Sequence, residues 1–149
     1  IEACLVGSEM CIRDRASALP NNSNLIQASR NVNIQKVFWV IKKIKDRAKK
    51  FEHTHGRIPI IGCLGFTFKP DVDDIRESPA KKIIDDLISN NMDLLICEPN
   101  LKKLENINLF DLDYVIENSD FLVFLVAHKE FKNLDLKNKP YFDVCGVIS

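Results

Sequence analysis

The residues most capable of chemistry stand together in one charged loop. The seven residues that begin at Asp71, D-V-D-D-I-R-E, carry five charges, and Lys69 lies just before them. Ser78 and Pro79 follow, which pairs an N-cap serine with proline at the first position of a helix. A helix N-terminus presents free N–H groups to an anion. These residues therefore favour the binding of an anionic ligand, with Lys69 and Arg76 as the available cations.

The cysteines and histidines show no pattern of a metal or disulfide site. The five cysteines are an odd number without a C-x-x-C pair, and three of them fall in or directly after predicted strands. This spacing favours reduced, buried thiols over a disulfide framework or a zinc site. The histidines form no metal-ligand cluster either, so we expect no bound metal. The residues concerned are Cys4, Cys11, Cys63, Cys97, Cys145, His53, His55 and His128.

A buried strand must position the charged loop. Ile60 to Phe66 is a nearly continuous apolar run, which is typical of a strand covered on both faces of a parallel sheet. Gly62 and Gly65 interrupt it, and glycine in a strand marks a close approach of a ligand or another backbone. The helix capped by Ser78 then carries one apolar face, which consists of Ala80, Ile83, Ile84, Leu87 and Ile88. Ligands of open α/β sheets bind outside the carboxyl ends of the strands, where this loop would lie.

Strands and helices alternate through the rest of the C-terminal part. The predicted elements are a strand at 93–97, a short helix around 112–118, a strand at 121–126, a short helix at 129–134 and a strand at 141–144. This alternation predicts an α/β fold, a Rossmann-like doubly wound parallel sheet preceded by a long helix.

Two polar residues follow the ends of predicted strands. Glu98 closes the second strand, where dinucleotide-binding folds place an acid that accepts hydrogen bonds from a ribose hydroxyl. A plain turn role is equally open, because Pro99 alone would end the strand and the chain lacks G-x-G-x-x-G. His128 directly follows the third strand, so it either lies near a ligand crevice or is simply a loop histidine.

A helix of about 30 residues begins near Asn24, with Asn22 or Ser23 as its cap, and ends at His55 and Gly56. Its apolar seam consists of Ile34, Val37, Ile41, Ile44, Ala48 and Phe51. A helix of this length more often bridges two domains or packs against a partner subunit than lies on one small domain. Covering the sheet remains the alternative. The lysines and arginine of its second half are interpreted as a solvated face.

Composition excludes several classes of partner. Lys plus Arg and Asp plus Glu number 21 each, so no global field favours nucleic acid or a membrane surface. No apolar run reaches the length of a bilayer span and no leader pattern begins the chain, so we expect a cytoplasmic protein. Residues 1–15 are similar to a translated adapter sequence, with a disordered native tail as the alternative. The predicted organisation is thus 1–15 non-native, 16–56 long helix and 57–149 sheet domain.

The loop and its flanks resemble the UDP-glucose/GDP-mannose 6-dehydrogenase family. The signature G-x-x-F-K-x-x-x-x-D-x-R-E-S-P of its C-terminal, UDP-binding half matches residues 65–79. The bacterial UDP-N-acetyl-D-mannosamine dehydrogenases are the most similar group, because further motifs agree in order. These are R-x-V-N at 30–33, F-W-V at 38–40, E-P-N at 98–100 and L-V-x-H-x-x-F at 125–131. The resemblance covers roughly residues 19–148.

The resemblance implies a role for each matched residue. Phe68 and Lys69 would contact the UDP-sugar, and Arg76 would reach an NAD held mainly by an N-terminal half that this chain lacks. The implied reaction is the NAD-dependent, four-electron oxidation of a sugar C6 alcohol to a carboxylate, in an enzyme that dimerises through the long helix. The catalytic cysteine motif of the family has no match here, so no catalytic residue is expected in this fragment. Cys145 stands where the family usually has a basic residue.

Two other classes of function remain open at this stage. The chain could be a non-catalytic, Rossmann-type nucleotide-binding or regulatory module. It could also be a structural α/β domain whose charged loop only forms salt bridges.

Overall fold

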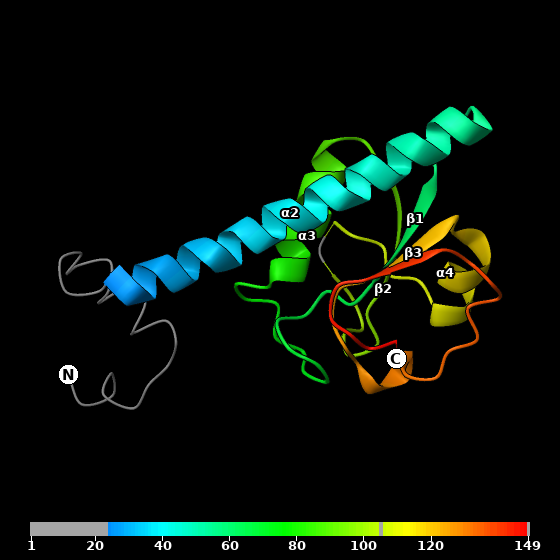
Figure 1. Ribbon diagram of the computed structural model, residues 1–149. Coiled ribbons are helices and arrows are strands. Elements are labelled where there is room, and N and C mark those ends of the chain that lie inside the picture. The colour runs from blue at the N-terminus through cyan, green and yellow to red at the C-terminus, as the bar shows by residue number, and fades with distance from the viewer. Residues whose placement is uncertain (1–23, 105, 149) are drawn as a thin grey trace. The chain divides into compact units, whose positions relative to one another are not determined.

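The computed structural model describes residues 24–104 and 106–148, and its elements alternate as the sequence predicts (Figure 1). The helices are α2 (Asn24–His55), α3 (Pro79–Ser89), α4 (Leu112–Asn118) and the 3₁₀ turn η3 (Lys129–Phe131). The strands are β1 (Ile60–Leu64), β2 (Asp93–Cys97), β3 (Phe121–Phe124) and β4 (Tyr141–Asp143).

The four described strands form one parallel sheet in the order β2-β1-β3-β4. Ile61 of β1 pairs with Leu94 on one side and with Phe121 on the other, so β1 is an interior strand. The chain moves outward from β1 to β2 and then crosses back over β1 to reach β3. This reversal makes the carboxyl edge between β1 and β3 the topological switch point, where open α/β sheets bind ligands.

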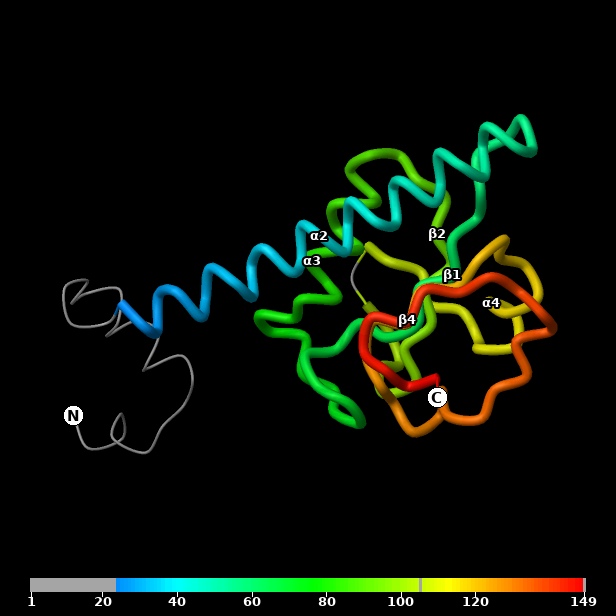
Figure 2. Tube along the Cα trace, viewed as in Figure 1, coloured from blue at the N-terminus to red at the C-terminus, as the bar shows by residue number. Residues whose placement is uncertain are grey.

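Helices cover both faces of the sheet, as a doubly wound fold requires. On one face, Val115 and Ile116 of α4 join a core cluster with Leu64, Leu122 and other residues. Strand side chains alternate between faces, so the buried residues Cys63 and Val123 point to the opposite face. There the second half of α2 lies beside α3, as Figures 1 and 2 show. The predicted fold class is confirmed.

Two strands end earlier than their apolar runs predicted. β1 stops at Leu64 instead of Phe66, because Gly65 has a φ of 98° and turns the chain out of the strand. β3 stops at Phe124 instead of Val126. Phe66 and Val126, beyond these ends, are buried in the loops of the carboxyl edge, so hydrophobicity alone overestimated the length of both strands.

The predicted helix at 129–134 is only the single turn η3, so this prediction was wrong in extent. Phe131 is fully buried and anchors the turn. Lys132 is already extended, with a φ of −80° and a ψ of 141°, and Asn133 then adopts a φ of 58°, so the helix does not continue.

Helix α2 has 32 residues and contributes to two compact units, which divide between Phe38 and Trp39. Within the second unit Val40, Ile41, Ile44 and Ala48 are buried. The Trp39 ring lies 6.0 Å from the Phe142 ring, and the Lys45 ammonium lies 2.6 Å from an Asp86 oxygen on α3.

The second half of the predicted seam therefore covers its own sheet domain, and the preference for a partner contact was wrong for Ile41 and Ile44. Their burial removes apolar surface from water inside the same unit. Ile34, in the first unit, is 48% exposed. The predicted caps Asn22 and Ser23 and the segment 1–15 lie outside the described residues. Among the helices of the described part, none combines the length and apolarity needed to cross a membrane.

Candidate functional site

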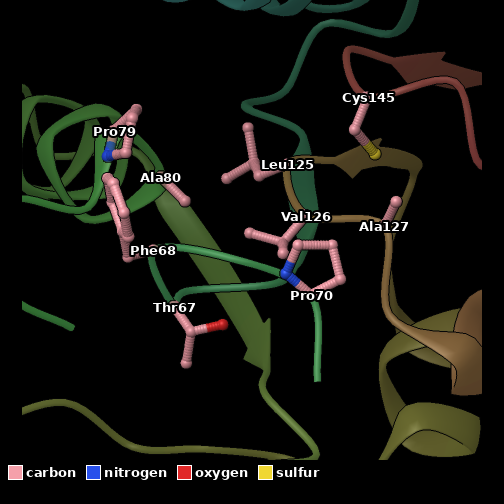
Figure 3. A pocket seen from close by; sticks show the side chains of 9 residues that line it. All are labelled: Thr67, Phe68, Pro70, Pro79, Ala80, Leu125, Val126, Ala127 and Cys145. Atoms are coloured by element: carbon pink, nitrogen blue, oxygen red, sulfur yellow. The ribbon is translucent and has the colours of Figure 1, made fainter. Parts of the chain in front are cut away.

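A cavity of about 240 Å³ opens at the switch point. Figure 3 shows Phe68, Pro79 and Ala80 on one side of it and Leu125, Val126, Ala127 and Cys145 on the other. Thr67 and Pro70 complete the lining. These residues come from the loops after β1, β3 and β4 and from the first turn of α3. Of the features that predicted an anionic site, the start of α3 at Pro79 lines this cavity, whereas Lys69 and Arg76 do not.

At Val126, which lines this cavity, the loops after β1 and β3 approach each other closely. A Cβ atom at Gly65 would stand 2.6 Å from the Val126 Cβ and 2.8 Å from its backbone nitrogen, so only glycine fits there. The Phe68 N–H then donates to the Asp74 carbonyl at 2.7 Å and closes the charged loop on itself. Gly65 therefore supplies the close approach that the sequence predicted at this position.

The structure separates the three predicted binding residues. Phe68 lines the cavity. Lys69 is exposed, is not among the lining residues, and places its ammonium 5.2 Å from the centre of the Phe68 ring. Arg76 is 79% exposed and binds Asp74, with an Nη2 to Oδ2 distance of 2.8 Å. This guanidinium holds the pKa of the Asp74 carboxyl at about 2.

Glu98 is buried and organises the start of the loop. One oxygen, Oε2, accepts the backbone N–H groups of Phe66 at 2.7 Å and Thr67 at 3.1 Å, and the other accepts the Asn100 N–H at 3.0 Å. Burial alone would raise the pKa of this carboxyl, but hydrogen bonds from His128, Asn100 and Phe66 outweigh it and lower the pKa to about 2. Both oxygens are thus engaged within the protein, which favours the turn role over a ribose contact.

His128 is fully buried and both of its ring nitrogens have partners. Nδ1 accepts the backbone N–H of Asp71 at 2.9 Å, so this nitrogen carries no proton. Nε2 lies 3.0 Å from Glu98 Oε2 and 3.3 Å from Thr67 Oγ1, which makes it the N–H donor of a neutral ring. The histidine is therefore neither a free loop residue nor an open ligand contact.

Within residues 24–104 and 106–148, one group of side chains is close enough together to hold a cation. Ligand atoms of Asp71, His128 and Glu130 all lie within 4.8 Å of one another. The lone pair of His128 Nδ1 is already used by the Asp71 N–H, so the group has no free imidazole nitrogen to offer. We assign no metal to it.

The thiols that the structure describes are poor nucleophiles. Burial raises the pKa of Cys63, Cys97 and Cys145 to about 12 in each case, and the carboxylate of Asp143 adds to the effect at Cys145. A thiolate is the reactive form of cysteine, so none of these residues is prepared for covalent catalysis.

Ser78 and Asp143 have structural roles beyond the N-cap that was predicted for Ser78. The Ser78 hydroxyl accepts the Lys81 N–H and caps α3 as predicted, but it also lies 2.8 Å from the Phe66 carbonyl oxygen. Asp143 accepts the N–H groups of Cys145, Gly146 and Ile148. An aspartate that ends a strand two residues before Cys-Gly is a recognisable turn signal, and it could have indicated this role.

Comparison with known proteins agrees with this geometry. Residues 62–149 match the model of the UDP-glucose/GDP-mannose dehydrogenase family, UDP binding domain. The UDP-N-acetyl-D-mannosamine dehydrogenase of Campylobacter jejuni is 42% identical over 120 residues, which cover 75% of this chain and 28% of that protein. An NDP-N-acetyl-D-galactosaminuronic acid dehydrogenase of Ralstonia solanacearum is 32% identical over 140 residues, which cover 89% of this chain and 32% of that protein.

Solved structures of the same kind share the fold. The UDP-N-acetyl-mannosamine dehydrogenase of Staphylococcus aureus superimposes with a TM-score of 0.72 at 28% identity, over 86% of this chain and 31% of that one. The chain spans about a third of the length of these relatives. With more than half of its residues matched by the family model, the chain belongs to the UDP-glucose/GDP-mannose dehydrogenase family and carries its UDP binding domain.

Proposed function

We propose that this chain binds the UDP-sugar of an NAD-dependent nucleotide-sugar 6-dehydrogenase. The single observation that carries the proposal is the cavity at the switch point, which brings the signature residue Phe68 together with the first turn of α3. A helix N-terminus favours anions, and a lysine supplies a point charge for a diphosphate. Phe68 and Lys69 are the proposed substrate-binding residues.

The proposed substrate is UDP-N-acetyl-D-mannosamine, which would be oxidised at C6 to the uronate. The support is the name of the 42% identical relative and of the structural neighbour with a TM-score of 0.72. NAD would accept the electrons, two molecules for each sugar.

The described residues do not fit a complete NAD site. No glycine-rich dinucleotide turn occurs in residues 24–104 and 106–148, and the Glu98 carboxylate that could meet a ribose is engaged by Phe66, Thr67 and Asn100. We therefore propose that NAD is held mainly by residues outside this chain, with Arg76 reaching it from the exposed side of the loop. No step of the reaction is assigned to this chain beyond substrate binding.

The proposed working form is a cytoplasmic homodimer associated through α2. Its support is the first half of the helix, in which Val32 is 62% exposed and Phe38 is 65% exposed. Apolar side chains of this size are common at subunit interfaces and costly to leave in water.

Titration calorimetry of the full 149-residue chain with UDP tests the proposal, with ADP as the matched nucleotide control. We expect saturable binding of UDP and much weaker binding of ADP. Because a ligand that binds only the folded state stabilises it, UDP should also raise the melting temperature. Equal affinity for the two nucleotides, or none for UDP, would contradict the proposal.

A further inference from the structure

Three loops, those after β1, β2 and β3, meet beside the proposed substrate cavity in a polar network whose centre is buried. Thr67 follows β1, Asp71 belongs to the charged loop, Asn100 follows β2, and the two central residues are Glu98 and His128. Neither central residue lines the cavity, whereas the neighbours Thr67, Phe68, Pro70 and Ala127 do. The two central residues therefore lie behind the site, whereas Thr67 belongs both to the network and to the cavity wall.

Side chains bind both the N–H and the carbonyl groups of the two residues that precede Phe68. The N–H groups of Phe66 and Thr67 donate to Glu98 Oε2, at 2.7 and 3.1 Å. The carbonyl oxygens of the same two residues lie 2.8 and 3.1 Å from the Ser78 hydroxyl. A loop backbone buried at this depth needs partners for its polar groups. Here the Glu98 carboxylate accepts both N–H groups, and the single hydroxyl proton of Ser78 is shared between the two carbonyl oxygens.

His128 connects this segment to the far end of the loop. Its Nε2–H is directed at Glu98 Oε2, 3.0 Å away, while its Nδ1 accepts the Asp71 N–H at 2.9 Å and lies 2.9 Å from Asn100 Nδ2. The Asp71 carboxylate in turn accepts the N–H of Lys129, the residue after His128, at 3.1 Å. The imidazole thus ties both ends of the Phe68–Pro70 segment to the loop after β3.

Burying a carboxylate and an imidazole in a core costs desolvation free energy. An apolar pair of the same volume is often at least as stable, so a buried polar pair is better explained by the geometry that it enforces. The geometry enforced here is the conformation of residues 66–71, which contain both proposed substrate-binding residues.

We propose that Glu98 and His128 are positioning residues, which hold the 66–71 segment in the conformation that binds the UDP-sugar. The inference rests on the proposed function for its ligand, but the loop conformation itself can be measured without one. Removal of either residue should loosen the segment and weaken nucleotide binding, although neither side chain touches the ligand.

The test compares His128→Gln with wild type and with Val115→Ala, a buried control on α4. A glutamine can still donate to Glu98 but has no acceptor at the position of Nδ1, so the Asp71 N–H loses its partner. We expect hydrogen exchange at the Asp71 amide to become at least about tenfold faster in His128→Gln and to change no more than that of distant amides in Val115→Ala. At equal folded fraction, UDP affinity should fall about tenfold in His128→Gln alone.

Each outcome separates the two proposals. If wild type binds no UDP, the proposed function fails, and the exchange rates still decide whether the pair positions the loop. Unchanged exchange at Asp71, or unchanged UDP affinity in His128→Gln when wild type binds, would overturn the positioning role. If His128→Gln does not fold, nitrogen NMR of the wild-type imidazole tests the proposal instead. A proton on Nδ1 at neutral pH would overturn the positioning role, because Nδ1 must accept the Asp71 N–H.

Discussion

Lys69 and Arg76 lie seven residues apart in one loop, yet the structure places them in different surroundings. The Lys69 ammonium lies near the Phe68 ring at the cavity, whereas Arg76 is occupied by Asp74. We predict that Lys69→Ala weakens UDP binding by roughly tenfold to a hundredfold, which corresponds to the loss of one charge-assisted contact of about 1.5–3 kcal/mol. Arg76→Ala should leave UDP affinity nearly unchanged. Titration calorimetry on the two variants measures both effects.

Lys49→Ala provides the matched control, because Lys49 is an exposed cation on α2. Equal losses in Lys69→Ala and Lys49→Ala would indicate a general charge effect instead of a contact. A large loss in Arg76→Ala would mean that the two loop cations have been assigned to the wrong ligands.

Glu98 makes the stability of the domain depend on pH. The folded-state pKa of this carboxyl is about 2, below its ordinary value of 4.5, so the stabilisation is present above pH 4.5 and is lost as the pH falls toward 2. Its size at neutral pH is on the order of 3 kcal/mol. We predict that Glu98→Gln lowers the unfolding free energy at pH 7 and that the difference from wild type shrinks between pH 4.5 and 2. Urea denaturation at several pH values measures it.

Asp74→Asn is the informative comparison for this effect. The Asp74 pKa is also about 2, but its ion pair with Arg76 is on the surface and is screened by solvent. Asp74→Asn should therefore change the stability little at any pH. An equal loss of unfolding free energy in both variants would show that the contribution of the Glu98 carboxylate to stability does not depend on its burial.

At the scale of elements, Ser78 joins the start of α3 to the end of β1. Its hydroxyl accepts the Lys81 N–H at 3.1 Å and lies within reach of the Phe66 carbonyl oxygen. We predict that Ser78→Ala destabilises the chain by roughly 2–3 kcal/mol, because it removes an N-cap and leaves a buried carbonyl without its donor. Chemical denaturation gives the value. Ser89→Ala, which removes an exposed hydroxyl near the other end of α3, should cost far less.

At the scale of the whole molecule, the two halves of α2 should respond differently to charge. Ile44 is fully buried in the sheet domain, so Ile44→Asp should unfold it, since an unpaired buried charge costs a large share of the stability of a small domain. Phe38 is 65% exposed, so Phe38→Asp should leave the fold intact and lower the association of subunits. Circular dichroism and analytical ultracentrifugation separate folding from association. Unchanged association in a folded Phe38→Asp variant would remove the proposed interface from this part of the helix.

The chain by itself is predicted to lack dehydrogenase activity. The described thiols have pKa values raised to about 12, and a hydride acceptor has no complete site among the described residues. Incubation of the purified chain with UDP-N-acetyl-D-mannosamine and NAD, followed at the absorbance of NADH, should show no increase. Turnover would mean that residues outside the described part supply both a nucleophile and an NAD site.

The sequence by itself determined the order and type of the elements. The apolar run before Gly65, the Ser78-Pro79 helix start and the strand at 93–97 are local patterns, and local hydrogen bonding and burial follow from them directly. The signature at 65–79 likewise identified the family, because a motif is a property of the chain and needs no coordinates.

Only the tertiary structure decided what the polar residues at the strand ends do. Glu98 and His128 are 30 residues apart, and their contact exists because β2 and β3 flank β1 in a parallel sheet. It also decided that Ile41 and Ile44 cover their own sheet, since an apolar helix face looks the same in sequence whether its partner belongs to the same domain or to another. An apolar period of 3.6 residues predicts that one face of the helix is buried. It does not predict which surface buries that face, because this depends on contacts between residues far apart in the sequence.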